Sequence, residues 1–248
     1  IPKGKIIGVV GESGSGKSIT SLAIMGLLPK TAKISSNSKI LFDSYQGEVD
    51  ILQLSSEEKR NFRGKEIGMI FQEPMTSLNP SLRCGEQVEE SIRLHLKLSK
   101  EKAKQRVLEL FEKVLLPNPE RIYKAYPHEL SGGQRQRVMI AMAISCEPKV
   151  LIADEPTTAL DVTVQRAILE LIKELQKESE LSCIFISHDL GVIAELCDEV
   201  VVMYKGEVVE SGKVEDIFQH PKENYTKGLI ACRPRLEVRY RELPTIAD

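Results

Sequence analysis

The sequence predicts an α/β fold in which a mainly parallel sheet is combined with an antiparallel β portion and an inserted α-helical part. Short runs of β-branched and apolar residues alternate with amphipathic segments over much of the 248 residues, a pattern that favours βαβ units. Between residues 76 and 147 this alternation stops, and helical periodicity continues without any candidate strand. The two patterns together predict a sheet-based core interrupted by a helical insertion.

The first part of the chain supplies the opening elements of the core. We expect a buried strand, a helix that follows a glycine loop, an antiparallel strand pair, a short helix and another strand, at residues 6–10, 17–28, 40–42 with 48–52, 57–63 and 67–71. Ser55 and Glu58 have the spacing of a capping box, which marks the start of the short helix.

The rest of the chain supplies the insertion and completes the core. Helices are predicted within 85–116 and at 131–146, 164–177 and 190–196; strands at 150–153 and 183–186; and a hairpin at 200–203 and 207–210, turning at Lys205-Gly206. We therefore predict a core from residues 1–75 and 148–212, a helical subdomain at 76–147 and a C-terminal extension at 213–248.

Composition excludes several classes of protein. A net charge of −2 argues against a broad nucleic-acid surface, so no nucleic-acid partner is expected. No apolar run reaches the roughly 18 residues that a membrane span needs, and no signal peptide pattern is present. The five cysteines are scattered without a C-x-x-C pair, so neither a zinc site nor a disulfide framework is predicted. These features favour a soluble, cytosolic protein.

The segment GESGSGKS at residues 11–18 follows a buried strand and opens a helix, the context that a phosphate-binding P-loop requires. Glycines let backbone N–H groups converge on phosphate oxygens, and the helix N-terminus adds its positive dipole end. Lys17 is then expected to reach the β- and γ-phosphates, while the Ser18 hydroxyl binds Mg²⁺. The motif predicts a P-loop NTPase (RecA-like) core that binds a nucleoside triphosphate.

The segment VLIADEP at residues 150–156 is an apolar strand that ends in two carboxylates. Asp154 is placed to hold the Mg²⁺ shell, and Glu155 could polarise the attacking water as a general base. Taken alone, the same pattern fits a buried strand that meets water at an acidic turn. Its pairing with the P-loop favours the catalytic interpretation.

The segment LSGGQRQR at residues 130–137 places Ser131 and two glycines at the start of a predicted helix, a second potential anion site. An ordinary capped helix explains these residues equally well on physical grounds alone. If both helix starts bind phosphate, two copies of the chain account for them, with each nucleotide held by one copy's loop and the other copy's serine-led helix.

Six motifs in order make the chain resemble the ATP-binding cassette of ABC transporters: the P-loop, Gln72 after a strand, LSGGQ, the strand ending in Asp-Glu, ALD at 159–161 and ISHD around His188. The resemblance implies a head-to-tail dimer with two ATP molecules and Mg²⁺ at its interface. It implies that Gln72 contacts the metal site, that Asp161 helps the copies communicate, and that His188 holds the γ-phosphate and attacking water. The nucleotide-binding residues implied by the motifs are Gly11, Ser13, Gly14, Ser15, Gly16, Lys17, Ser18, Ile19, Ser131, Gly132, Gly133, Gln134 and Asp161; the catalytic ones are Glu155, His188 and Gln72; and the metal ligands are Ser18, Gln72 and Asp154.

FQEPMTSLNP at residues 71–80 and the tail IFQHPKENYTKGLIACRP are similar to the oligopeptide, dipeptide and nickel importer ATPases. This resemblance implies an ATPase at the cytoplasmic face of the cell membrane, with a second ATPase domain and permease subunits as partners and an extracytoplasmic binding protein acting indirectly. It also implies strands and an adenine-stacking aromatic residue before Ile1. Two alternatives remain at this point: a non-transport ABC ATPase, and a clamp that binds ATP to regulate a partner.

Overall fold

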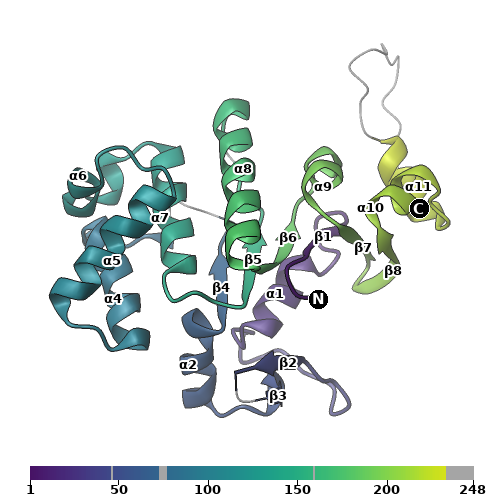
Figure 1. Ribbon diagram of the computed structural model, residues 1–248. Coiled ribbons are helices and arrows are strands. Elements are labelled where there is room, and N and C mark those ends of the chain that lie inside the picture. The colour runs from purple at the N-terminus through teal and green to yellow at the C-terminus, as the bar shows by residue number, and fades with distance from the viewer. Residues whose placement is uncertain (46, 73–76, 159, 233–248) are drawn as a thin grey trace.

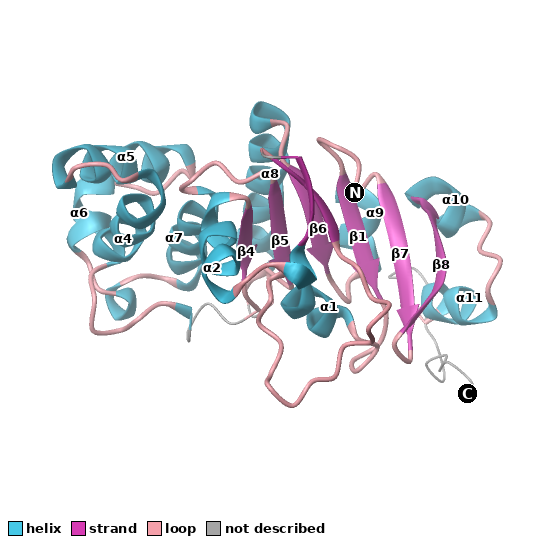
Figure 2. Ribbon diagram, turned by 90° about the horizontal axis from the view of Figure 1, so that it is seen from below, coloured by secondary structure: helices cyan, strands magenta, loops and turns pink. Residues whose placement is uncertain are grey.

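The computed structural model describes residues 1–45, 47–72, 77–158 and 160–232. A six-stranded sheet with the order β4-β5-β6-β1-β7-β8 forms its centre (Figures 1 and 2). The strands are β1 (Ile6–Val10), β4 (Ile67–Ile70), β5 (Val150–Asp154), β6 (Ser182–Ile186), β7 (Glu199–Tyr204) and β8 (Glu207–Lys213). All neighbours pair in parallel except β7 and β8, which form an antiparallel hairpin. The predicted α/β class with a mainly parallel sheet is confirmed.

A separate antiparallel pair, β2 (Leu41–Ser44) with β3 (Gly47–Asp50), supplies the predicted antiparallel portion. The helices are α1 (Lys17–Ile24), α2 (Ser56–Lys65), α4 (Cys84–Leu96), α5 (Lys100–Lys113), α6 (Pro119–Lys124), α7 (Gly132–Ile144), α8 (Val162–Ser179), α9 (Leu190–Leu196), α10 (Val214–Gln219) and α11 (Asn224–Ala231). Short 3₁₀ turns occupy Ile51–Gln53 and Pro127–Glu129.

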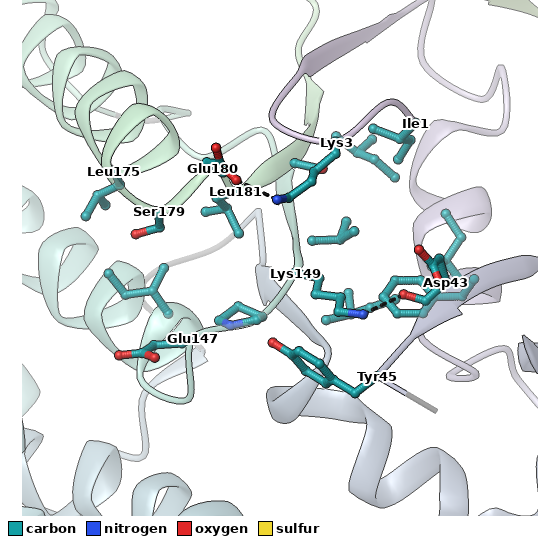
Figure 3. Close-up of a pocket in the computed structure, with 18 of the residues that line it drawn as sticks. Ile1, Lys3, Asp43, Tyr45, Glu147, Lys149, Leu175, Ser179, Glu180 and Leu181 are labelled. Carbon is teal, nitrogen blue, oxygen red and sulfur yellow. Dashed lines mark hydrogen bonds and ion pairs between the residues drawn. The ribbon is translucent and has the colours of Figure 1, made fainter. Parts of the chain in front are cut away.

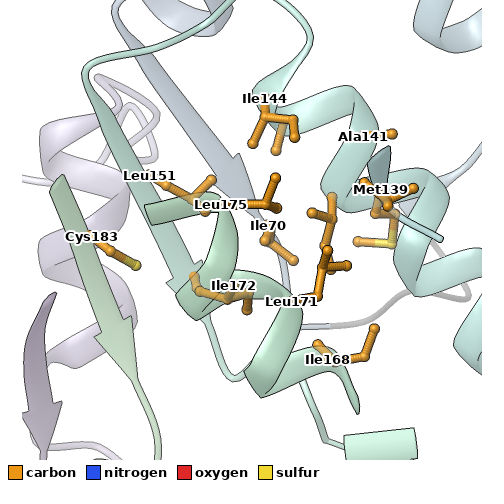
Figure 4. Close-up of a cluster of buried hydrophobic side chains, with 14 of the residues drawn as sticks. Ile70, Met139, Ala141, Ile144, Leu151, Ile168, Leu171, Ile172, Leu175 and Cys183 are labelled. Carbon is orange, nitrogen blue, oxygen red and sulfur yellow. The ribbon is translucent and has the colours of Figure 1, made fainter. Parts of the chain in front are cut away.

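The two faces of the sheet are covered by different apolar clusters. Alternate residues of β5 point to opposite faces, so Leu151 joins one cluster and Ile152 joins the other. Figure 4 shows the first cluster where α7 and α8 meet the sheet, with Ile70, Leu151 and Cys183 facing helix residues that include Met139 and Leu171. Because both faces are covered there, β1, β4, β5 and β6 are almost fully buried, as parallel strands usually are, whereas β8 at the edge of the sheet is largely exposed.

The helices α4, α5, α6 and α7 pack on one another and gather beside the β4 edge of the sheet (Figures 1 and 2). α6 and the 3₁₀ turn at Pro127–Glu129 were not predicted, because the prolines and short length of this stretch hide any helical periodicity. The boundaries proposed for the core, helical subdomain and extension stay predictions. No helix within the described part of the chain is long and apolar enough to cross a membrane.

Local signals explain several element ends. The Ser55/Glu58 capping box is present at α2, and the Lys205-Gly206 turn of the β7–β8 hairpin has the positive φ at both central residues that a type I′ turn requires. α1 ends at Ile24 rather than near residue 28, because Gly26 adopts φ 62°, the left-handed conformation that terminates helices.

Candidate nucleotide-binding and catalytic site

The sequence-predicted site residues follow the carboxyl ends of parallel strands. The P-loop follows β1, Gln72 follows β4, Asp154 ends β5 and His188 follows β6. Since β4, β5, β6 and β1 are consecutive neighbours in the sheet, these ends meet at one edge, where α/β proteins place their ligands.

The phosphate loop requires glycine at positions 11 and 16, where the backbone has a positive φ. Gly11 has φ 150°, and a Cβ there would overlap the carbonyl oxygen of Met203 on β7. Gly16, at the N-terminal end of α1, has φ 103°, a left-handed conformation that side chains disfavour. The loop therefore takes a compact path that leaves the N-terminus of α1 free of side-chain caps. Such a terminus is suited to an anion.

Lys17 folds over this loop. Its side chain is buried, and Nζ donates to the carbonyl oxygens of Gly11 and Glu12, each at 2.8 Å, and to Ser15 Oγ at 3.4 Å. Burial lowers the pKa of the Lys17 ammonium, although Glu155 and Asp154 act in the opposite direction. The cation is thus held at the centre of the loop by neutral oxygens, which phosphate oxygens can replace.

Ser18 and Asp154 meet as the predicted metal site requires. Ser18 Oγ donates to Asp154 Oδ1 at 3.3 Å, and both residues line a cavity of about 510 Å³ together with Gln72. Asp154 is only 5% exposed, and burial raises the pKa of its carboxyl. A hydroxyl, a carboxylate and an amide are hard oxygen donors of the kind that Mg²⁺ prefers. The residues present therefore fit this ion.

Glu155 is the centre of a polar cluster. Its Oε2 accepts a hydrogen bond from Gln72 Nε2 at 3.0 Å and from Thr158 Oγ1 at 2.9 Å, and lies 3.3 Å from His188 Nδ1. The backbone of Glu155 is in the left-handed region with φ 47°, an unfavourable conformation for glutamate. Glu155 N–H donates to the carbonyl oxygen of Ile186, which ties the residue to β6. The fold thus holds one carboxylate oxygen between side chains from three separate segments.

The serine-led start of α7 has hydrogen bonds of its own, whereas Met139 and Met142 farther along the helix line the same cavity as Ser18, Gln72 and Asp154. Ser131 caps α7, as predicted, and forms a capping box that was not: Ser131 Oγ accepts from Gln134 N at 3.2 Å, and Gln134 Oε1 accepts from Ser131 N at 3.1 Å. Asp161 caps α8 through Val164 N at 2.9 Å. Within the described residues, no hydrogen bond or ion pair joins Ser131–Gln134 or Asp161 to the P-loop. Ser131 and Asp161 are exposed, as are Ser13, Gly14 and Ile19 of the loop.

Two residues near the site were missed by sequence reasoning. Thr158 binds Glu155 but belongs to none of the motifs used above, although a hydroxyl three residues after a candidate base is a usable signal. Tyr225, on α11, accepts a hydrogen bond from Glu12 N–H of the P-loop at 3.0 Å. No local pattern predicts this contact, because the two residues are separated by 213 positions.

A larger cavity of about 1160 Å³ lies elsewhere and contains none of the predicted site residues. Figure 3 shows it between Ile1, Tyr45, Lys149 and Glu180, where Lys149 Nζ donates to Asp43 O at 2.8 Å. It adjoins the amino ends of β5 and β6, through Val150 and Ser182, and so opens at the opposite edge from the P-loop. Volume alone therefore does not identify the functional site here.

Known protein families and individual proteins resemble this chain in sequence. A family profile described as "ABC transporter" matches residues 1–158, and one described as "Oligopeptide/dipeptide transporter, C-terminal region" matches residues 209–248. The chain is 55% identical over 237 residues to the oligopeptide transport ATP-binding protein OppD of Bacillus subtilis, with 96% of this chain covered. It is 50% identical to the dipeptide transport ATP-binding protein DppD of the same organism, covering 98% of this chain and 72% of that protein. It is 52% identical to the glutathione import ATP-binding protein GsiA of Escherichia coli K12, with 95% of this chain covered.

Solved structures give the same picture of the fold. The chain is similar to the ATP-binding cassette MJ0796 in a dimeric, post-hydrolysis state bound to ADP and Pi, with a TM-score of 0.71, 30% identity, and 86% of this chain and 87% of that chain covered. A second dimeric structure of MJ0796 gives a TM-score of 0.74 at 30% identity, with the same coverage. The chain spans 65% of the length of OppD and 38% of that of GsiA.

Proposed function

Because the chain belongs to the ABC transporter family, we propose that it is an ATP-hydrolysing subunit that drives an importer of short peptides. The observation that carries the proposal is the position of Glu155, whose carboxylate lies between Gln72, Thr158 and His188 and follows directly after Asp154. A carboxylate held beside a phosphate loop is suited to act as a general base toward water.

The proposed chemistry is hydrolysis of the bond between the β- and γ-phosphates of ATP. Glu155 accepts a proton from the attacking water, and Gln72 and His188 keep the carboxylate aimed at it. Lys17 exchanges the carbonyl oxygens of Gly11 and Glu12 for phosphate oxygens and so offsets their negative charge.

Ser18, Asp154 and Gln72 would hold Mg²⁺. Since Gln72 Nε2 is engaged by Glu155, its amide oxygen is the atom that remains for the metal. The ion supplies charge neutralisation at the β- and γ-phosphate oxygens.

We further propose that the working unit contains two such ATPase domains. Ser131, Gly132, Gly133 and Gln134 form a helix start that is separate from the P-loop of its own chain and is suited to contact a γ-phosphate bound by a second copy or a paralogue. Asp161 at the start of α8 is then a candidate for communication across this interface. The dimeric MJ0796 structures support this arrangement by similarity.

The cargo class follows from the relatives. The names of OppD and DppD specify oligopeptide and dipeptide transport, and that of GsiA specifies glutathione import, all small peptides. The profile match at residues 209–248 supports the same class. We propose that the chain docks on permease subunits at the cytoplasmic face of the membrane, with an extracytoplasmic binding protein selecting the substrate.

The test is the variant Glu155→Gln, which preserves the shape of the side chain but removes the base. We expect Mg²⁺-dependent ATP turnover to fall by about 10²- to 10⁴-fold, while MgATP still binds and a nucleotide-bound dimer accumulates in size-exclusion chromatography. Glu195→Gln, an exposed carboxylate on α9, is the matched control and should retain turnover. Unchanged turnover in Glu155→Gln would refute the assignment of the base, and absence of turnover in the wild-type chain with permeases supplied would favour the ATP-dependent clamp.

A further inference from the structure

The back of the phosphate loop rests on segments from the far end of the chain. Gly206 N–H, in the β7–β8 turn, donates to Ser15 O at 3.1 Å. The Met203 side chain and the β7–β8 turn also lie close to Gly16. A Cβ added at Gly16 would be 3.4 Å from Met203 Cε and 3.6 Å from Gly206 Cα. The hairpin therefore limits how far the loop can retract from a bound nucleotide.

A second support comes from α11. Tyr225 OH accepts the N–H of Glu12 at 3.0 Å, so one of the loop's backbone donors is engaged by the C-terminal part of the chain. The ring of Tyr225 packs on the ring of Tyr204 at the end of β7, with centroids 4.2 Å apart and an interplanar angle of 33°. The tyrosine is thus fixed from the side of the hairpin as well as through its own helix.

The start of α11 is itself anchored. The carboxylate of Glu210 on β8 accepts the N–H of Lys222 at 2.8 Å through Oε1 and the N–H of Glu223 at 3.2 Å through Oε2. Glu223 is the residue immediately before α11. A chain of contacts therefore runs from β8 through Glu210 to α11, and from Tyr225 to the phosphate loop.

We propose that Tyr225 is a positioning residue for nucleotide binding, which holds the phosphate loop in its binding conformation through the Glu12 N–H. This inference rests on the proposed function, because its effect is on the affinity for ATP. Tyr225 acts on the loop and not on the reacting atoms. A loop that must be ordered at the moment of binding lowers the affinity by the fraction of time it is out of position.

The decisive variant is Tyr225→Phe, which retains the ring and its packing on Tyr204 but removes the acceptor oxygen. We expect the Kd and KM for MgATP to rise about twofold to tenfold, the range that the loss of one hydrogen bond allows, with kcat unchanged. A raised KM with an unchanged kcat is expected when the lost interaction stabilises the bound substrate and the transition state equally. A merely structural effect would reduce the active fraction and so lower the apparent kcat at constant KM.

Tyr204→Phe is the matched control. It removes a neighbouring hydroxyl that makes no hydrogen bond within the described residues, and it should bind MgATP as the wild type does. Hydrogen exchange at the Glu12 amide gives a readout without nucleotide: exchange should accelerate in Tyr225→Phe and stay at the wild-type rate in Tyr204→Phe.

The outcomes separate the two proposals. If the wild type hydrolyses ATP and Tyr225→Phe leaves both KM and Glu12 exchange unchanged, the positioning role is wrong and the proposed function stands. If Glu12 exchange accelerates but KM is unchanged, the contact exists but does not position the loop for nucleotide, and the inference is again overturned. If the wild type neither binds nor hydrolyses ATP, the proposed function fails, and the positioning role fails with it.

Discussion

Thr158 offers a sharp test of how Glu155 is held. Replacing Thr158 with Val keeps the size and β-branching of the side chain but removes the hydroxyl that donates to Glu155 Oε2 at 2.9 Å. Hydrogen bonds to charged groups contribute about 1.5–3 kcal/mol. The Glu155 side chain is 16% exposed, and Gln72 and His188 remain beside the same oxygen, so the lower end of this range applies.

An energy of about 1.4 kcal/mol corresponds to a tenfold change in rate. We therefore expect kcat of Thr158→Val to fall about tenfold, with KM for ATP nearly unchanged, because Thr158 is bonded to the proposed base and not to the phosphate loop. Steady-state phosphate release measures both constants. Thr158→Ser keeps a hydroxyl and should restore most of the rate, while Thr157→Val, one residue earlier, is the control for the substitution itself. A Thr158→Val rate within twofold of wild type, or an equal loss in Thr158→Ser, would refute the reasoning.

Two further predictions concern the nucleotide-free protein and use thermal unfolding. Burial raises the pKa of the Asp154 carboxyl above its value in the unfolded chain, so the fold disfavours the ionised form at neutral pH. Asp154→Asn should therefore raise the Tm at pH 7 while abolishing MgATP binding. This gain in Tm should appear as the pH rises above the ordinary pKa of an aspartate carboxyl, about 3.9, and vanish below it. A Tm advantage that grows as the pH is lowered would contradict the argument. Gly133→Ala would place a Cβ 2.7 Å from Val164 Cγ1 and should lower stability by about 1 kcal/mol after the gain in helix propensity, whereas at Gly132 the nearest atom is 3.5 Å away, so Gly132→Ala should be neutral or stabilising. Equal Tm values for the two alanine variants would show that the contact with Val164 does not constrain Gly133.

Motifs that combine a local backbone requirement with a chemical role were predictable from sequence. A phosphate loop at the end of β1 is implied by the buried strand, the glycines and Lys17. The Asp-Glu pair after a second buried strand implies a carboxylate beside this loop. The structure agrees, because Ser18 Oγ donates to Asp154. Family resemblance implied that Gln72 lies at the metal site and His188 at the γ-phosphate and attacking water, but it did not predict that both contact Glu155. A single polar residue at the end of a strand does not indicate which other side chains it contacts.

Contacts between segments far apart in the sequence could not be predicted. Periodicity predicts that the β7–β8 hairpin exists, but it predicts neither the two helices of the C-terminal extension nor the contacts of Gly206 with Ser15 and of Tyr225 with Glu12. These contacts depend on the sheet order, in which β7 is placed beside β1. The proposed roles of Ser131 and Asp161 need a second chain, so no single copy can display them.

The pairing of β1 with β7 has a consequence for synthesis of the protein. The residues that support the back of the phosphate loop, Met203, Gly206 and Tyr225, are synthesised about 200 codons after the loop itself. At about 5–20 residues per second this is a delay of roughly 10–40 s. During that interval the nascent chain contains the phosphate loop but not the β7–β8 hairpin and α11, which pack against it. Nucleotide can therefore assist only the late steps of folding, and chains truncated before the hairpin should be neither bound nor stabilised by ATP.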